Sequence, residues 1–350
     1  MIKRRKTRLI KVGNVDIGAD SAISVQSMTN TNTKDVESTI KQIHRLEEAG
    51  CDIIRFAVND LEDAQAIEKI KANINIPCVA DIQFNYKLAL LSAKYGADCI
   101  RINPGNIGEK WKVEEVVSAC KDKNIPIRIG VNAGSINQKI LDKFNGVNSD
   151  SIVQSALEDI NILESLNFNQ IKVSLKASNV NLSIESYRKF SEISDYPLHL
   201  GITESGMGLA GIVKSSVGMG TLLAEGIGDT IRVSLTDDPV EEVLVGKQIL
   251  KSLGLRQEGV EIIACPTCAR TKIDLIELVK EAENRLSKVD KNISVALMGC
   301  VVNGLGEGRE ADIGITGGNG QGVIFKKGEI IKKVPENQLL DELMKEIENL

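Results

Sequence analysis

The stretch VESTIKQIHRLEEAGCDIIRFAV, residues 36–58, decides the fold class because it contains one complete helix-to-strand unit. In its first half Ile40 and Ile43 fall at helical spacing, and Gly50 is suited to end the helix. Its second half, DIIRFAV (52–58), has the apolar and β-branched composition of a short strand. A helix followed closely by a strand predicts parallel strands joined by right-handed crossovers.

The same alternation continues along the chain as far as residue 259. Eight segments are predicted strands: 22–28, 52–58, 77–83, 98–104, 127–132, 171–176, 198–204 and 230–235. Amphipathic stretches such as 86–97 separate them. Eight such units match the size of a (β/α)₈ TIM-type barrel, which we predict for residues 1–259. A doubly wound sheet has the same local pattern and remains the alternative within the α/β class.

The pattern changes after residue 259, so we predict a second, α+β domain over 260–350. A short strand leads into CPTCAR (265–270), and SVALMGC (294–300) forms another strand before a glycine-rich stretch. The tail ENQLLDELMKEIENL (336–350) is amphipathic and predicts a helix.

Composition excludes several classes of protein. The net charge of −5 and an aromatic fraction of 3% argue against a nucleic-acid-binding surface. The basic start, MIKRRKTRLIKVG (1–13), is expected to be a solvated first strand, and no apolar core of a signal peptide follows it. No apolar run approaches the length of a membrane span. We therefore expect a cytoplasmic protein without membrane or nucleic-acid partners.

Five predicted strands end in a cationic residue: Arg55, Arg101, Arg128, Lys176 and Arg232. Polar residues share a strand face with three of them, in the pairs Arg101 with Asn103, Arg128 with Asn132, and Arg232 with Ser234. Strand ends meet at the mouth of a barrel, where active sites are built, and guanidinium groups suit phosphate. Any one arginine could form a surface ion pair, but five together predict an anion-binding site. Glycine-rich stretches at 206–211, 218–220 and 226–229 are expected to be loops, whose glycines serve either turn geometry or backbone contact with the anion.

The seven cysteines fall into two groups. Without a secretion signal, Cys265, Cys268 and Cys300 indicate a metal or redox site rather than disulfides. Glu307 is an oxygen donor close enough in sequence to be a fourth ligand. Three thiolates and one exchangeable oxygen favour an iron–sulfur cluster, with zinc or an unmetallated redox pair as alternatives. The other group, Cys51, Cys78, Cys99 and Cys120, is expected to be buried as small hydrophobic side chains.

Eight stretches strongly resemble the 4-hydroxy-3-methylbut-2-enyl diphosphate synthase family of the non-mevalonate isoprenoid pathway. They are VQSMTNTNTKD (25–35), RINPGN (101–106), RIGVNAGS (128–135), SLKAS (174–178), PLHLGITESG (197–206), EGIGDTIRVSLT (225–236), CPTCAR (265–270) and MGCVVNGLGE (298–307). The resemblance covers essentially the whole chain and matches the compact bacterial form, a barrel joined to a [4Fe–4S] domain. It implies two-electron reductive ring opening of 2-C-methyl-D-erythritol 2,4-cyclodiphosphate, with loss of water.

The same resemblance implies partners and residue roles. Reduced flavodoxin or ferredoxin would donate the electrons, and two chains would form a homodimer in which each cluster domain caps the other barrel. The cluster ligands would be Cys265, Cys268, Cys300 and Glu307. The substrate-binding residues would be Arg55, Arg101, Asn103, Arg128, Asn132, Lys176, Arg232, Ser234 and Asn303, with Glu204 and Glu307 as catalytic residues.

Three positions depart from the pattern of that family. Gln83 stands where a histidine is usual and cannot titrate, so no acid–base role is assigned to it. Ala269 replaces a glycine, and Leu305 replaces a proline in the turn that precedes Glu307. Two rival interpretations remain open from the residues alone. One is a zinc-containing barrel enzyme with Lys176 as a Schiff-base nucleophile, and the other is a non-enzymatic iron–sulfur scaffold.

Overall fold

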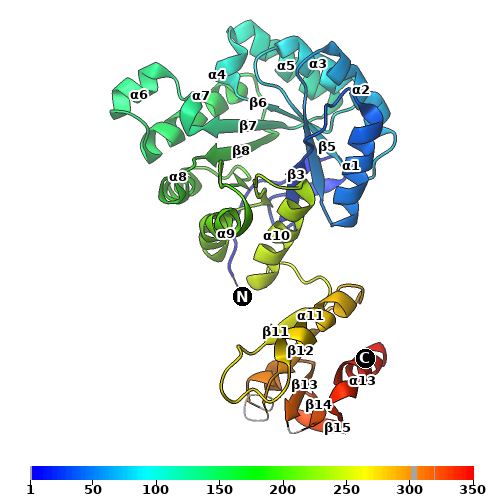
Figure 1. The fold of residues 1–350 in the computed structure, drawn as a ribbon. Helices are drawn as coiled ribbons and strands as arrows, with labels where there is room; N and C mark the ends of the chain where they lie inside the picture. The colour runs from blue at the N-terminus through cyan, green and yellow to red at the C-terminus, as the bar shows by residue number, and fades with distance from the viewer. Residues whose placement is uncertain (1, 301–305, 319) are drawn as a thin grey trace. The chain divides into compact units, whose positions relative to one another are not determined.

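The computed structural model describes residues 2–300, 306–318 and 320–350 (Figure 1). The chain divides into two compact units, a barrel unit of residues Met1–Arg256 and a C-terminal unit of residues Gln257–Leu350. Each unit has its own hydrophobic core. Among the described residues, none of the helices is long and apolar enough to cross a bilayer.

Eight parallel strands form the centre of the barrel unit. They are β3 (Ser24–Met28), β4 (Ile53–Ala57), β5 (Cys78–Asp81), β6 (Cys99–Ile102), β7 (Ile127–Asn132), β8 (Ile171–Lys176), β9 (His199–Leu200) and β10 (Thr230–Ile231). Their order is β8-β7-β6-β5-β4-β3-β10-β9, and a bridge between Val173 and Leu198 joins the two edges. The eight predicted strands and the (β/α)₈ barrel are confirmed. The doubly wound alternative is wrong, because such a sheet keeps two open edges.

Helices surround this barrel, as Figure 1 shows. They are α1 (Val36–Glu48), α2 (Leu61–Lys71), α3 (Tyr86–Lys94), α4 (Pro104–Ile107), α5 (Lys110–Lys123), α6 (Gln138–Phe144), α7 (Ser149–Ser165), α8 (Val180–Ile193), α9 (Gly208–Ala224) and α10 (Pro239–Ser252), with the 3₁₀ turn η1 (Ala133–Ser135). The Asp35 side chain caps α1, and Gly50 follows the end of the helix at φ +90°, a conformation that favours glycine. The helix predicted within residues 36–50 is therefore confirmed as α1.

The expectation of loops at 206–211 and 218–220 is wrong for residues 208–211 and 218–220, because they lie inside α9. A Cβ atom at Gly218 would lie 2.6 Å from the side chain of Ile202. The glycine is therefore used for close packing of α9 against the segment that follows β9, rather than for a turn.

The basic N-terminal segment, residues 1–13, contains the strand β1 only from Ile10, and the described residues before it are neither strand nor fully solvated. Arg4 pairs with Asp229 at 2.9 Å, and Arg5 donates to the Tyr196 carbonyl at 2.6 Å and to the Ser194 carbonyl. The first strand pair comes later, as the hairpin β1 (Ile10–Val12) and β2 (Val15–Ile17). This hairpin packs on residues from the starts of β4, β5 and β6 and covers that end of the barrel. The segment is fixed because its guanidinium groups satisfy carbonyl oxygens and a carboxylate.

A five-stranded mixed sheet forms the C-terminal unit, which confirms an α+β architecture there. Its strands are β11 (Glu261–Ala264), β12 (Ser294–Met298), β13 (Ile313–Gly318), β14 (Gln321–Lys326) and β15 (Glu329–Pro335), in sequence order. The helical elements are α11 (Leu275–Leu286), η2 (Glu307–Glu310), η3 (Glu336–Gln338) and α13 (Leu339–Glu348). The two helices α11 and α13 contribute apolar residues to the core of this unit.

Candidate functional site

Six cationic side chains gather inside the barrel. Lys176 ends β8 and Arg232 follows β10, whereas Arg128 and Lys172 are the second residues of β7 and β8, so the prediction that Arg128 ends its strand is wrong. Arg55, Arg101, Arg128, Lys172 and Lys176 are buried, and Arg232 is half-buried. Their charges interact across the barrel, since Lys176 on β8 is affected by Arg55 on β4 and by Arg232 after β10. The structure thus brings together all five cations that the sequence singled out, and adds Lys172.

Asp81 is the carboxylate at the centre of this group. Its Oδ1 accepts a hydrogen bond from Arg101 at 3.0 Å, and its Oδ2 lies 3.8 Å from Arg55 Nε. Burial by itself would raise the pKa of Asp81, but the positive charges of Arg55 and Arg101 outweigh it and lower the pKa. Gln83, one of the three departures, donates to the same carboxylate at 3.3 Å. Asp81 orders the two arginines without neutralising the group.

The remaining positive charge is costly in the absence of a ligand. Burial and the charges of neighbouring arginines hold the pKa of Lys176 and of Arg55 well below their usual values. Several buried polar atoms also have no hydrogen-bond partner among the described residues: Nε of Arg101, Arg128 and Arg232, Oγ of Ser234, and both amide atoms of Gln26. Buried polar groups are normally paired, so these atoms indicate an anionic ligand with several acceptor oxygens.

Two glycines make room for the cations. A Cβ atom at Gly130 would lie 2.6 Å from Arg101 Nε, and one at Gly201 would lie 2.9 Å from Lys176 Nζ. Each glycine stands on a neighbouring strand or its extension, where any side chain would displace the charged group. The glycines in RIGVN and HLGIT are therefore explained by the site and not by turns.

The uncharged and acidic residues predicted for the site differ in burial and in location. Asn103 is buried, and its Oδ1 caps α4 by accepting from the Gly105 amide at 3.0 Å. Asn132 is half-buried at the end of β7. Glu204 is exposed on the loop after β9 and has a left-handed backbone at φ +55°, which is uncommon for a residue other than glycine. Asn303 lies outside the described residues, as do Leu305 and the side chain of Glu307.

Sequence reasoning missed the two buried groups Lys172 and His199. Lys172 is fully buried, donates to Thr230 Oγ1 at 3.4 Å and has its pKa lowered to about 8 by burial. Strand alternation places it on the same face as Lys176, which is the signal that could have found it. His199 lies against Arg128, and burial followed by the charge of Arg128 lowers the pKa of His199 far below its usual value. Its imidazole is therefore neutral.

The three late cysteines belong to the carboxyl ends of two adjacent strands. Cys265 directly follows β11, and Cys300 follows β12, which pairs in parallel with β11. The Gly299 amide donates to Cys265 Sγ at 3.2 Å. Cys268 is exposed, and a hydrogen bond from the backbone of Arg270 lowers the pKa of its thiol. The four early cysteines are buried, as expected.

The chemical types of these donors fit an iron–sulfur cluster. Three unpaired cysteines on one edge of a sheet are soft ligands, and an N–H···S hydrogen bond is the type of contact that tunes such clusters. Within residues 2–300, 306–318 and 320–350, no three candidate ligands already stand close enough to hold a metal ion together. The described donor set therefore indicates which residues would bind, without giving the geometry of the bound group.

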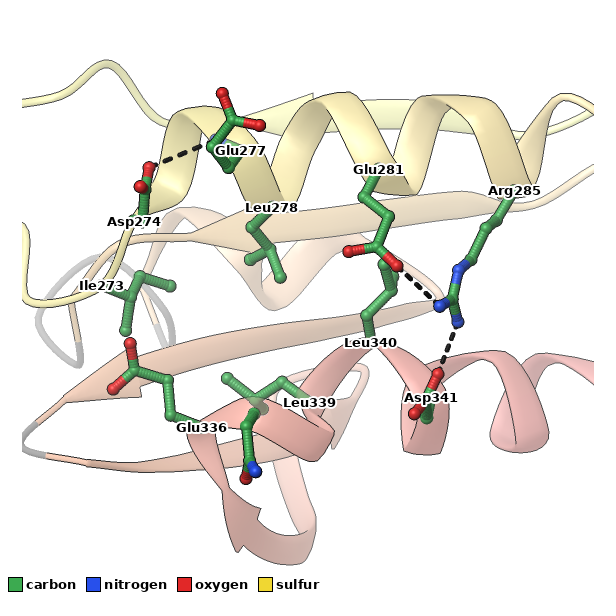
Figure 2. A pocket seen from close by; sticks show the side chains of 11 residues that line it. Ile273, Asp274, Glu277, Leu278, Glu281, Arg285, Glu336, Leu339, Leu340 and Asp341 are labelled. Carbon is green, nitrogen blue, oxygen red and sulfur yellow. Dashed lines mark hydrogen bonds and ion pairs between the residues drawn. The ribbon is translucent and has the colours of Figure 1, made fainter.

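A pocket in the C-terminal unit does not contain these cysteines. Figure 2 shows it between α11 and the segment from η3 into α13, with leucines at its base and carboxylates around it. Arg285 donates to Glu281 and Asp341, both at 2.6 Å, and so joins the two helices. The pocket is acidic, and none of the predicted site residues lines it.

Both units match protein-family models. Residues 7–247 match the GcpE TIM-barrel domain, and residues 261–349 match the GcpE protein C-terminal domain. The chain belongs to the GcpE family. A relative from Clostridium perfringens (strain 13 / Type A), named 4-hydroxy-3-methylbut-2-en-1-yl diphosphate synthase (flavodoxin), is 61% identical over 100% of both chains. A GcpE relative of the same name from Geobacter sulfurreducens is 53% identical over 99% of this chain and 98% of its own.

More distant solved structures share the barrel alone. A truncated 3-deoxy-D-arabino-heptulosonate 7-phosphate synthase from Thermotoga maritima has a TM-score of 0.53 at 16% identity, covering 71% of this chain and 94% of its own. Dihydropteroate synthase from Yersinia pestis has a TM-score of 0.51 at 12% identity, covering 70% of this chain and 97% of its own. At these identities the likeness establishes the fold of the GcpE barrel and not its chemistry.

Proposed function

We propose that this chain is a 4-hydroxy-3-methylbut-2-en-1-yl diphosphate synthase. It converts 2-C-methyl-D-erythritol 2,4-cyclodiphosphate to (E)-4-hydroxy-3-methylbut-2-enyl diphosphate by two-electron reductive ring opening with loss of water. Reduced flavodoxin, which the names of the relatives specify, or ferredoxin supplies the electrons. The observation that carries the proposal is the buried group of cations with unpaired donors at the mouth of a GcpE barrel.

The barrel residues bind and orient the cyclic diphosphate. Arg55, Arg101 and Arg128 present guanidinium groups from β4, β6 and β7, and Lys176 adds an amino group from β8, the neighbour of β7. Asn103, Asn132, Arg232 and Ser234 are proposed to add polar contacts to the ligand. Burial, followed by repulsion from the neighbouring arginines, lowers the pKa of Lys176, and a bound diphosphate would offset that repulsion. Burial and repulsion together explain the low pKa without a Schiff-base role for the lysine.

The proposed cofactor is a [4Fe–4S] cluster in the C-terminal unit, held by Cys265, Cys268, Cys300 and Glu307. When bound, it supplies electrons and a Lewis-acidic iron. Asn303 is proposed to contact the substrate from the same unit. Glu204 is proposed to move a proton or stabilise charge near the substrate carbons, and its left-handed backbone is the kind of strained conformation that occurs at functional sites.

The proposal is tested with protein purified under anaerobic conditions. We expect a brown protein whose visible and EPR spectra show an iron–sulfur cluster, and which forms the diphosphate product from the cyclic diphosphate with reduced flavodoxin. A colourless protein with stoichiometric zinc that still turns the substrate over would contradict the cofactor. A brown protein that neither binds nor converts the cyclic diphosphate would contradict the enzymatic role.

We also propose that the working unit is a cytoplasmic homodimer in which the cluster domain of one chain caps the barrel of the other. Large apolar side chains support this proposal. Phe84 and Met207 are 71% and 66% exposed on loops that follow β5 and β9, and Leu209 is 78% exposed in the first turn of α9. These loops leave the carboxyl ends of their strands, which is the end that holds the site. Exposed large apolar side chains at one end of a barrel are typical of an interface.

Subunit exchange tests this arrangement. Chains carrying Cys300→Ser are mixed with chains carrying Arg101→Ala, and exchange is verified with two size tags. A heterodimer with shared sites has one site with both lesions and one with neither, so we expect activity to return to a part of the wild-type level. If exchange occurs and the mixture stays inactive, each chain uses its own cluster domain.

A further inference from the structure

The barrel sheet has one weak seam, between β8 and β9. Elsewhere the strands pair over two or more consecutive residues, and β7 pairs with β8 from Ile127 to Asn132. At the seam the pairing is a single bridge between Val173 and Leu198, supported by a hydrogen bond from the Val173 amide to the Pro197 carbonyl at 2.9 Å. The barrel therefore needs another element to fix the distance between β8 and β9 at the mouth.

The hydroxyl of Tyr187 occupies that position. Tyr187 belongs to α8 on the outside of the barrel and is fully buried. Its oxygen accepts from the Leu175 amide at 3.1 Å and donates to the His199 carbonyl at 2.6 Å. In a regular parallel ladder, the bond after Val173 to Pro197 would run directly from the Leu175 amide to the His199 carbonyl. The hydroxyl is inserted into this bond and holds the strands apart by one oxygen atom.

Both ends of the bridge lie next to site residues. Leu175 directly precedes Lys176, whose ammonium lies close to Gly201, two residues beyond His199. The ring of His199 supports Arg128, because Arg128 Nη1 lies 3.3 Å from both ring nitrogens. An atom at the same distance from both nitrogens must lie over the ring face, since in the ring plane it would collide with the carbon between them. Each hydrogen bond of the Tyr187 hydroxyl therefore ends on a residue beside the site. Leu175 directly precedes Lys176, and His199 supports Arg128.

We propose that Tyr187 is a positioning residue for the diphosphate site, in that its inserted hydroxyl sets the width of the β8–β9 seam and thereby the spacing of Lys176 and Arg128. The inference rests on the proposed function, because it assigns the two cations to one diphosphate ligand. Tyr187 itself does not touch the substrate. It acts from the outer helix layer, through one amide and one carbonyl group.

The test compares Tyr187→Phe with Tyr196→Phe in the full-length protein. Tyr196 is a matched control because it is also buried, and its hydroxyl donates to Glu164 at 2.7 Å before the start of β9. Each variant removes a hydroxyl that has two hydrogen-bond partners, so both variants are expected to lose thermal stability. We expect only Tyr187→Phe to weaken the binding of inorganic diphosphate, measured by calorimetry, by about tenfold. It should raise KM for the cyclic diphosphate by a similar factor and change kcat less.

Equal diphosphate affinity in Tyr187→Phe, Tyr196→Phe and the wild type would overturn the role of Tyr187. Failure of the wild type itself to bind inorganic diphosphate would instead overturn the proposed site. Hydrogen exchange of the wild type keeps the test independent of how well the variant folds. If the seam and the site are coupled, saturating diphosphate must slow exchange of the Leu175 amide, because linkage is reciprocal. Unchanged exchange at Leu175 with diphosphate bound would also overturn the proposal.

Discussion

Replacing Cys268 by serine is expected to abolish cluster binding and all turnover while the barrel stays folded. Cys268 is the exposed member of the three late cysteines, so the substitution removes a thiolate without disturbing packing. A serine oxygen is a hard, weakly acidic donor and a poor substitute for a thiolate on iron. After anaerobic reconstitution we expect about four irons per wild-type chain and less than about one in the variant.

Two observations control this experiment. The chain has a single tryptophan, Trp111, in α5 of the barrel unit, so its fluorescence reports whether the barrel remains folded. Cys51→Ser is the matched substitution, because Cys51 is buried in the barrel and its Sγ donates to the Ile53 carbonyl at 3.1 Å, a bond that serine can also make. Cys51→Ser should keep its iron and activity. Retention of iron by the Cys268→Ser protein would show that Cys268 is not a ligand.

Replacing Lys176 by methionine is expected to weaken substrate binding and to increase stability. Loss of one charge-assisted contact should cost about 1.5–3 kcal/mol, or about 10- to 150-fold in the affinity for the cyclic diphosphate. The free energy of unfolding should rise at neutral pH, because a buried ammonium whose pKa is held far below its usual value destabilises the folded chain. Calorimetry measures the loss of affinity for the cyclic diphosphate. Thermal unfolding without ligand measures the gain in stability.

Arg101→Ala should weaken binding by a similar factor but without a gain in stability. It removes the hydrogen-bonded partner of Asp81 at 3.0 Å and so leaves a buried carboxylate less well paired. Lys189→Ala is the control for loss of a lysine, since Lys189 forms an exposed pair with Asp150 on the outer helices and should change neither quantity by much. Unchanged affinity in both Lys176→Met and Arg101→Ala would place the ligand elsewhere.

The sequence predicted the positions of the strands well and the limits of the helices less well. Strand positions were accessible because buried parallel strands are short apolar runs, and their polar ends mark the mouth. The error at residues 218–220 has a clear cause. Glycine there was assigned to a turn, whereas Ile202 and α9 approach each other too closely for a side chain. That approach joins segments separated in sequence, so no local pattern contains it.

The basic N-terminus was misjudged for a related reason. A run of positive residues at a chain end is normally solvated, and the partners of Arg4 and Arg5 lie far away in sequence, at Asp229 and Tyr196. Long-range pairing of this kind depends on the closed barrel, which brings the first and last strands together. The sequence could identify the charges but not their partners.

By itself, the sequence determined the α/β class with eight strands, the set of cationic residues on those strands, the cysteine pattern and the family, because each depends on spacing along one chain. Closure of the sheet into a barrel was decided by the tertiary structure. Only the tertiary structure decided how the charges are arranged. It placed Asp81 between Arg55 and Arg101, put Lys172 below the mouth, and set His199 against Arg128. It also inserted the Tyr187 hydroxyl into the seam. These features join residues from different strands and helices, and such contacts form only when the barrel closes and removes their polar groups from water.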